Sequence, residues 1–284
     1  MYQILYQIAL ATFNLFFPIY LIQIGYSLWE IAMWYVMNQI GFVLFTPFAG
    51  KVVHKIGMKR AMMTKLPCLA IYYYCIRFLT GNFGVDWPFA LALLLFRSFK
   101  AFGDFGEDLF FVKYILKKSE GAMIAWVKIV LVLAGVLAPL LGGLITYVWG
   151  FDALFMLGVI LTLVAAIPLF LTPEKHFSVD YTPEDVVDFS FKKIEKSYIV
   201  AEAGRILPDT LMWILWPVFL YTVVQSTVDL GVVLSLSAFV SILFAYSIGK
   251  RIDSKHKPRS LLKKGVHTAT GCFFLRSLSL HPLL

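Results

Sequence analysis

The chain has 284 residues, of which 60% are hydrophobic and 15% charged, whereas soluble domains are about half apolar and a quarter charged. This composition excludes a disordered chain and argues against a water-soluble enzyme. The 25 Lys and Arg residues outnumber the 17 Asp and Glu residues, which gives a formal charge of +8. The positions of these cations must decide between a nucleic-acid partner and the basic loops of a membrane protein.

Long apolar runs dominate the sequence. A membrane core of about 30 Å needs roughly 20 apolar residues in a helix, and we expect spans at 2–24, 28–49, 60–79, 88–111, 122–148, 154–171, 199–223 and 229–249. A ninth, weaker run begins near Leu261. The first run lacks the basic start and the small-residue cleavage site of a signal peptide, so we expect it to remain as a span. The sequence predicts an all-α polytopic membrane protein.

The cations fall on alternate connections between these spans. Lys and Arg residues follow spans two, four, six and eight, whereas the other connections, 25–27, 80–87, 149–152 and 222–228, contain none. This is the positive-inside pattern. It predicts an integral protein of the cytoplasmic or plasma membrane, with the lipid bilayer as a partner and a cytoplasmic N-terminus. Because the cations are divided among four loops without a binding motif, we expect no nucleic-acid partner.

Residues 172–197 form the one connection that is aqueous in character throughout. Thr182 supplies an N-cap hydroxyl, Pro183 suits the first helical position, and Asp185 places an acid at the third. Apolar residues follow at Val186, Val187 and later positions. We expect a short amphipathic helix on the cytoplasmic surface, with a flexible linker as the alternative.

The chain repeats itself at an offset of 199 residues. This shift aligns polar and turn-forming residues as well as apolar ones: Pro18 with Pro217, Ser27 with Ser226, Glu30 with Asp229, Gly50 with Gly249, Lys51 with Lys250, and Arg60 with Arg259. Spans seven and eight are therefore expected to repeat spans one and two, in a unit of six spans that keeps its orientation. Two such units exceed 284 residues, so we expect either a fragment or a degenerate second half.

This repeat predicts three parts. They are an N-terminal six-helix bundle at 1–171, a cytoplasmic linker at 172–197, and a partial second bundle at 198–284 with helices seven, eight and a fragment of nine.

Three short motifs stand out in and beside these spans. The first follows span two and contains, in order, Gly50, Lys51, His54, Gly57, Lys59 and Arg60. It is similar to the loop between helices two and three in the major facilitator superfamily of secondary transporters, where glycines allow close approach and a tight turn. His54 stands where the family usually has an aspartate, whereas the second copy keeps the acid as Asp253, after Gly249. The resemblance implies that these loops take part in conformational change.

The second motif begins at Arg97 on span four and is similar to the family's arginine followed by small residues. Arg97, Lys100, Asp104 and Glu107 recur at steps of three or four, which puts them on one helical face. Charges inside a membrane are costly, so this face must meet water or a partner helix. We expect Arg97 either to bind an anionic solute group or to set the protonation of a nearby acid, with Asp104 a candidate partner.

Other polar residues complete the candidate site. We interpret Glu107 and Asp108 as surface acids that pair with Lys55 or Lys59, whereas Lys100 lies as deep as Arg97. Further cavity candidates lie on spans one, two and seven; they are Asn14, Gln39 and Asp209. Interhelical hydrogen bonds are the alternative interpretation for the amides.

The third motif lies on span five and is centred on Pro139. It contains Gly135, Gly142 and Gly143 and looks like the family's glycine-rich fifth-helix motif, which is commonest in exporters that exchange substrate for protons. The small residues are expected to open a groove for a neighbouring helix, and Pro139 to kink its own. A purely structural packing role is the alternative.

The resemblance implies transport of a small solute by alternating access, with proton coupling and export favoured. If spans ten to twelve are missing, we expect this chain to be weakly active or inactive. The alternative is a non-transporting receptor or scaffold that keeps the fold. The sequence contains no CxxC, HExxH or phosphate-binding glycine loop, so we expect no enzyme activity, cofactor or metal. A membrane protease or lipid-modifying enzyme is the remaining enzymatic alternative.

Overall fold

The computed structural model describes residues 2–115, 120–171, 195–255, 265, 268 and 270–271. Within its helices, the side chains of 111–131, 198, 203, 205–213 and 242–255 are outside the description. The chain divides into two compact units, Met1–Leu236 and Ser237–Leu284, and the site lies in the first. The second unit contributes the last part of one helix, Thr227–Lys255, and short helical pieces beyond it.

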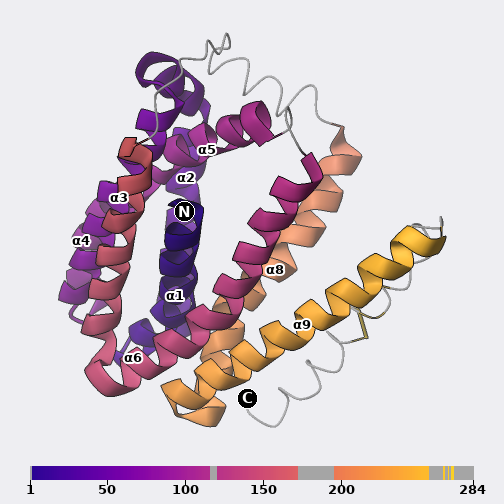
Figure 1. Cartoon of the computed structure of the whole chain (residues 1–284). Coiled ribbons are helices and arrows are strands. Elements are labelled where there is room, and N and C mark those ends of the chain that lie inside the picture. The colour runs from indigo at the N-terminus through magenta and orange to yellow at the C-terminus, as the bar shows by residue number, and fades with distance from the viewer. Residues whose placement is uncertain are drawn as a thin grey trace. The chain divides into compact units, whose positions relative to one another are not determined.

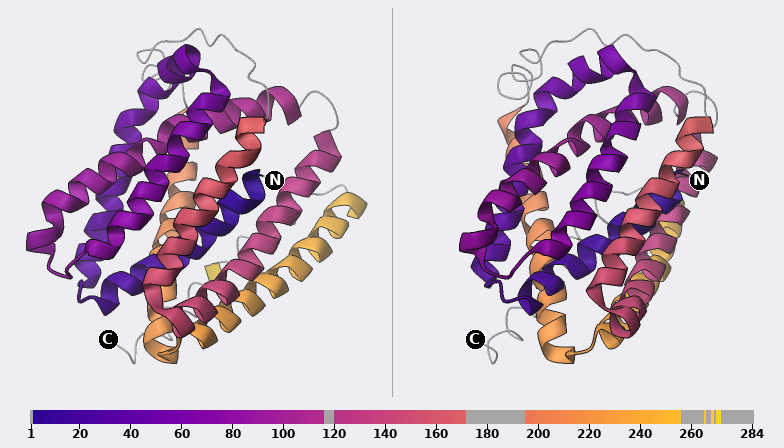
Figure 2. Two further views of the ribbon diagram at one scale, coloured as in Figure 1. Left: turned by 60° about the vertical axis from the view of Figure 1, so that its left-hand side comes forward. Right: turned by 90° about the vertical axis from the view of Figure 1, so that its left-hand side faces the viewer.

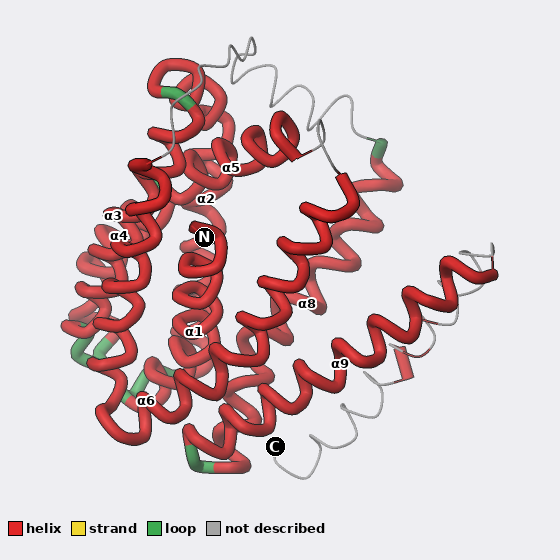
Figure 3. The backbone as a smooth tube through the Cα atoms, in the orientation of Figure 1, coloured by secondary structure: helices red, strands yellow, loops and turns green. Residues whose placement is uncertain are grey.

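The described part of the chain is helical and contains no strand (Figures 1 and 3). Its elements are α1 (Tyr2–Gln23), α2 (Leu28–Ile56), α3 (Met58–Cys75), the 3-10 turn η1 (Ile76–Phe78), α4 (Phe83–Ser98), α5 (Lys100–Ile115), α6 (Glu120–Leu171), α8 (Lys196–Val224) and α9 (Thr227–Lys255). The prediction of an all-α chain is confirmed. The expected amphipathic helix after Thr182 and the ninth span near Leu261 lie outside the described residues.

The structure divides span four, whereas spans five and six are present as two helical legs. Span four is interrupted at Phe99, which separates α4 from α5 and packs against Phe45 with ring centroids 5.7 Å apart. Spans five and six correspond to two helical legs of α6, which are separated at Gly150, with φ 80° and ψ 177°. A positive φ is favourable only for glycine, so Gly150 makes the reversal between the two legs of α6, residues 120–149 and 151–171.

The helices that the offset of 199 residues relates begin in the same way. Ser27 caps α2, and its hydroxyl accepts a hydrogen bond from the Glu30 N–H at 3.3 Å. The Glu30 carboxylate in turn accepts a hydrogen bond from the Ser27 N–H. Ser226 precedes α9 and accepts from the Asp229 N–H at the same distance of 3.3 Å. The shift also carries Leu28, the first residue of α2, onto Thr227, the first residue of α9, so the repeat extends to the starts of these helices.

An aromatic core holds the first unit together. Phe13 of α1 packs against Tyr73 of α3 with ring centroids 4.1 Å apart and against Phe155 of α6 at 5.6 Å. The Trp34 indole of α2 donates a hydrogen bond to the Tyr72 hydroxyl at 3.2 Å. Both legs of α6 lie beside α1 (Figure 2). Because lipid is as apolar as these side chains, such close packing stabilises helix association in a membrane.

Apolar side chains also cover the outside of the helices. Within the described residues, Tyr2–Gln23, Leu28–Ile56 and Val132–Leu171 are long and apolar enough to span a membrane. Trp29, Trp87 and Trp149 are exposed near the connections that carry no Lys or Arg, as in the aromatic belt of a membrane interface. Water would make this surface unfavourable, whereas lipid accommodates it.

The connections that lack Lys and Arg are tied to one another. The buried Asp86 carboxylate of α4 accepts hydrogen bonds from the Tyr26 hydroxyl at 2.7 Å, the Thr80 N–H at 2.9 Å, the Thr80 hydroxyl at 3.0 Å and the Gly81 N–H at 3.1 Å. Burial and the hydrogen bond to Asp86 raise the pKa of Tyr26, so Tyr26 remains a neutral donor. We call these contacts the Asp86 cap; it joins the α1–α2 and α3–α4 connections.

Candidate functional site

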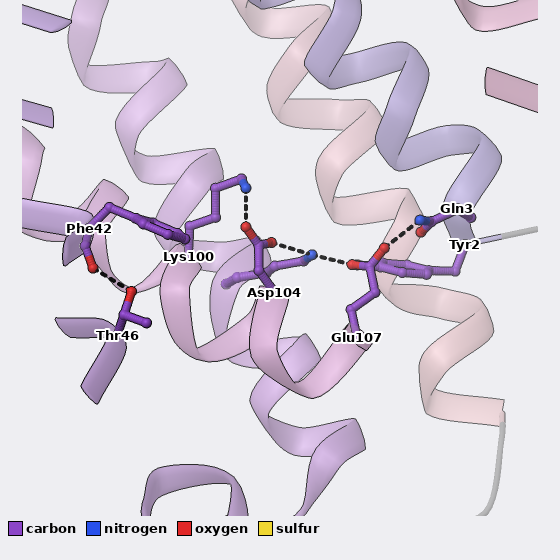
Figure 4. A network of polar contacts seen from close by, with 8 residues as sticks. Tyr2, Gln3, Phe42, Thr46, Lys100, Asp104 and Glu107 are labelled. Atoms are coloured by element: carbon purple, nitrogen blue, oxygen red, sulfur yellow. Dashed lines mark hydrogen bonds and ion pairs between the residues drawn. The ribbon is translucent and has the colours of Figure 1, made fainter. Parts of the chain in front are cut away.

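The most concentrated polar contacts of the described bundle centre on Lys65 of α3. Its side chain is 0% exposed, and its ammonium lies 3.0 Å from Asp104 Oδ1 of α5. It also forms an ion pair with Glu107 Oε2, one turn further along α5. Figure 4 shows the two carboxylates on one face of the helix, each joined by a dashed line to the same nitrogen.

Glycines of α5 allow it to approach α3 closely, and one of them, Gly103, makes room for the Lys65 side chain. A Cβ added at Gly103 would lie 2.6 Å from Lys65 Cβ and Cγ, and one at Gly106 would lie 2.9 Å from the Met58 carbonyl oxygen. Aromatic rings of α1 complete the enclosure, because the Lys65 ammonium lies 4.2 Å from the Tyr6 ring centroid. The buried cation is therefore stabilised by two carboxylates and by the electron-rich face of a ring.

The contacts extend in both directions from Lys65. Asp104 also pairs with Lys100, whose ammonium lies 5.8 Å from the Phe42 ring. Glu107 accepts hydrogen bonds from the Tyr2 hydroxyl at 3.1 Å and from the Gln3 amide (Figure 4). We call the alternating set Lys100, Asp104, Lys65 and Glu107 the charge row. Its two cations and two anions balance, which makes a charged cluster tolerable inside a helix bundle.

This arrangement corrects the expected partners of the acids. Glu107 pairs with Lys65 inside the bundle and not with Lys55 or Lys59, because α5 packs along α3 and brings Glu107 over a buried lysine. Asp108, on the next position of the helix, is exposed, as expected for a surface acid.

Arg97 lies half-buried in the last turn of α4, three residues before Lys100. Its guanidinium lies 5.3 Å from the centroid of the Tyr72 ring. Asp104, the acid suggested as its partner, is bonded to Lys65 and Lys100 instead. Tyrosine rings and not a carboxylate therefore accompany Arg97 among the described side chains.

The remaining cavity candidates are scattered. Gln39 of α2 is exposed, whereas its neighbour Asn38 is 6% exposed and its amide nitrogen has no hydrogen-bond partner in the described structure. Asn14 is half-buried on α1. The backbone of Asp209 belongs to α8, and its side chain lies outside the description. The structure thus places Asn38, and not Gln39, on the inward face of α2.

The first motif is more helical than expected. Gly50 lies buried within α2, which continues to Ile56, and the turn is made by Gly57 alone, with φ 90° and ψ 153°. Lys59 and Arg60 already belong to the first turn of α3. In the second copy, Gly249 and Asp253 belong to α9. One glycine with a positive φ suffices for the reversal, so the other motif residues remain helical.

Two glycines of the third motif, both on α6, contact two different neighbouring helices. A Cβ at Gly142 would lie 2.8 Å from Phe16 Cδ2 of α1, and one at Gly143 would lie 3.3 Å from Gly231 Cα of α9. Across this second contact, the Thr227 hydroxyl donates to the Gly143 carbonyl at 3.2 Å, and the Ser235 hydroxyl donates to the Val136 carbonyl at 2.6 Å.

Two members of that motif behave differently from the expectation. A Cβ at Gly135 would meet nothing within 4 Å, so this glycine opens no groove for a described neighbour. Pro139 lies inside α6 without a break in helical dihedrals, since the non-helical position is Gly150. Pro139 instead contributes its carbonyl group to the contact with Gly231.

The sequence analysis missed Lys65 as a site residue. Lys65 is the only cation between residues 61 and 76 of an otherwise apolar span. An ionisable residue in such a position indicates a functional or paired group by default. The sequence alone could therefore have identified Lys65 as a candidate. The described residues contain no group of His, Cys, Asp and Glu that could hold a metal ion.

Apolar helices of membrane-spanning length, with a balanced row of charges enclosed among them, define an α-helical polytopic membrane protein. Residues 1–279 match the family model of the Major Facilitator Superfamily. The chain therefore belongs to this superfamily of secondary transporters, as the three motifs indicated. A comparison with curated proteins finds no match.

Proposed function

We propose that the protein exports a small solute in exchange for protons by alternating access, and that the charge row is the element that responds to protons. The observation that carries this proposal is the enclosure of two carboxylates, Asp104 and Glu107, around one fully buried lysine. A carboxylate that gains a proton loses its charge, and the balance of the charge row then changes by one unit.

The consequence of protonation follows from the contacts of Glu107. A neutral Glu107 no longer pairs with Lys65, so the cation would depend on Asp104 alone. Because Glu107 also holds Tyr2 and Gln3 of α1, the same proton would loosen the contact between α1 and α5. Proton occupancy is thereby linked to the packing of α1, α3 and α5, which is the kind of linkage that coupled transport requires.

The direction of transport is proposed from the third motif. The pattern Gly135, Pro139, Gly142 and Gly143 resembles that of proton-exchanging exporters, and Gly142 and Gly143 make the close contacts of α6 with α1 and α9. A receptor or scaffold needs no titratable group in its interior, so a buried charge row favours transport over that alternative.

Proton coupling is tested in proteoliposomes that contain the protein and a pH-sensitive dye. Glu107→Gln and Asp104→Asn should each abolish proton movement driven by a solute gradient. The matched control is Asp108→Asn, which removes an exposed acid next to Glu107 and should leave proton movement unchanged. Wild-type coupling in the Glu107→Gln and Asp104→Asn variants, with folding verified, would contradict the assigned role of the charge row.

We further propose a cytoplasmic N-terminus and two bundles, at 1–171 and from 198 onward, joined by the linker 172–197. The distribution of cations and the matching starts of α2 and α9 support this arrangement. Single cysteines at Val85 and Lys55, in a background without other cysteines, test the orientation. An impermeant maleimide added outside the cell should label position 85 and spare position 55; the reverse labelling would invert the topology.

A further inference from the structure

Arg97 differs from the cations of the charge row in its described partners. The charge row is neutral, whereas Arg97 forms no ion pair with an acid among the described side chains. The helices that pack against α4 place aromatic residues near Arg97. Tyr72 and Tyr73 of α3 and Tyr35 of α2 lie within electrostatic range of the guanidinium. The surroundings of Arg97 are therefore electron-rich but carry no described negative charge.

An unpartnered amide lies on the helix face beside Arg97. Asn38 is 6% exposed, and its Nδ2 makes no hydrogen bond to any described residue. It follows Tyr35 by three residues and precedes Gly41 by three, which places all three on one face of α2. Gly41 packs against Ser98, the residue next to Arg97. Asn38 thus lies between two positions of α2 that both adjoin the surroundings of Arg97.

Donors outnumber acceptors in this region. Arg97 has five N–H groups and no acceptor, and the Asn38 Nδ2 has two N–H groups. The Tyr72 hydroxyl accepts from Trp34 and is also a hydrogen-bond partner of Arg97, so one hydroxyl serves two donor side chains. Buried donors without acceptors are costly. The group that would satisfy all of them carries acceptor oxygens and one negative charge.

We propose that Arg97 and Asn38 bind the anionic group of the transported solute, and that this solute is a monoanion with an apolar or aromatic body. The proposal rests on the proposed function, in which a small solute is transported. A carboxylate or sulfonate would accept from Arg97 and Asn38, while the rings of Trp34, Tyr35 and Tyr72 would pack against its body. One negative charge would neutralise Arg97, which has no acidic partner among the described side chains, so dianions and cations are disfavoured.

Titration calorimetry of the purified protein in an uncharged detergent tests this site. The probes are benzoate, benzenesulfonate and hexanoate, with benzamide as the neutral isostere of benzoate. We expect saturable binding of at least one anion and none of benzamide. Arg97→Gln should weaken binding at least tenfold, Arg97→Lys should retain part of it because the planar fork is lost, and Asn38→Leu should weaken it several-fold.

The matched control is Arg77→Gln. It removes an arginine of η1 that pairs with Asp152, and it should leave anion binding unchanged. Equal unfolding midpoints show that the variants are folded. The proposal is overturned if no probe anion binds, or if binding persists in folded Arg97→Gln. Glu107→Gln separates the two proposals: retained benzoate binding with lost proton coupling supports both. Retained coupling would remove the proton role and leave the anion site standing.

Discussion

Replacing Lys65 by methionine tests the charge row most directly. The side chain is fully buried and pairs with Asp104 and Glu107, which are 25% and 19% exposed. Removing one partner of a buried ion pair costs about 3–5 kcal/mol, because the other charge is left uncompensated. Asp104 keeps Lys100, and Glu107 keeps the donors of α1, so we expect the lower end, about 3 kcal/mol. Methionine fills the same space and leaves little cavity.

The assay is the free energy of unfolding in mixed micelles, followed by circular dichroism. Combining Lys65→Met with Glu107→Gln removes one cation and one anion, keeps the pair of Lys100 with Asp104, and should recover most of the loss, since neutral replacements of buried ion pairs are often well tolerated. Lys55→Met removes an exposed lysine of α2 and should change the unfolding free energy little. A loss below about 1 kcal/mol for Lys65→Met, the size of an exposed pair, would refute this account of the charge row.

Three further substitutions test the packing. Gly143→Val should separate α6 from α9, because its Cβ would meet backbone atoms of α9; cysteines at Val136 and Ser235, adjacent in the fold, should then no longer crosslink. Asp86→Asn should cost about 2 kcal/mol of unfolding free energy, since an amide cannot accept all four hydrogen bonds of the Asp86 cap. Gly103→Val should cost about 1–3 kcal/mol by displacing the stem of the buried lysine; unchanged unfolding would contradict the close approach of α5 to α3.

The helices were predictable because membrane spans depend on length and apolar content, which a sequence displays directly. The expected spans 2–24 and 28–49 correspond to α1 and α2, and the offset of 199 residues relates the first residue of α2 to the first residue of α9. The predicted and observed helix boundaries differ where a single residue determines where a helix ends. Gly57 sets the end of α2 seven residues later than expected, and Phe99 divides the expected span four into α4 and α5.

The partners within the site were less predictable, because pairing depends on how helices rotate against one another. The face that contains Arg97, Lys100, Asp104 and Glu107 was recognised from spacing alone. The spacing could not reveal that α3 places Lys65 between the two acids, nor that Arg97 lies against Tyr72. Gly103, which admits Lys65, is one of many small residues in these spans, and only the facing helix distinguishes it.

The Asp86 cap determines how the orientation of this protein can be mapped. The N–H groups of Thr80 and Gly81 are both committed to a carboxylate on the following helix, so this connection has no slack for added residues. An epitope or reporter inserted at 80–81 would draw these donors away and expose a buried carboxylate. Topology reporters that leave chain length unchanged, such as a single reactive cysteine on the exposed Val85, preserve the fold that they are meant to report.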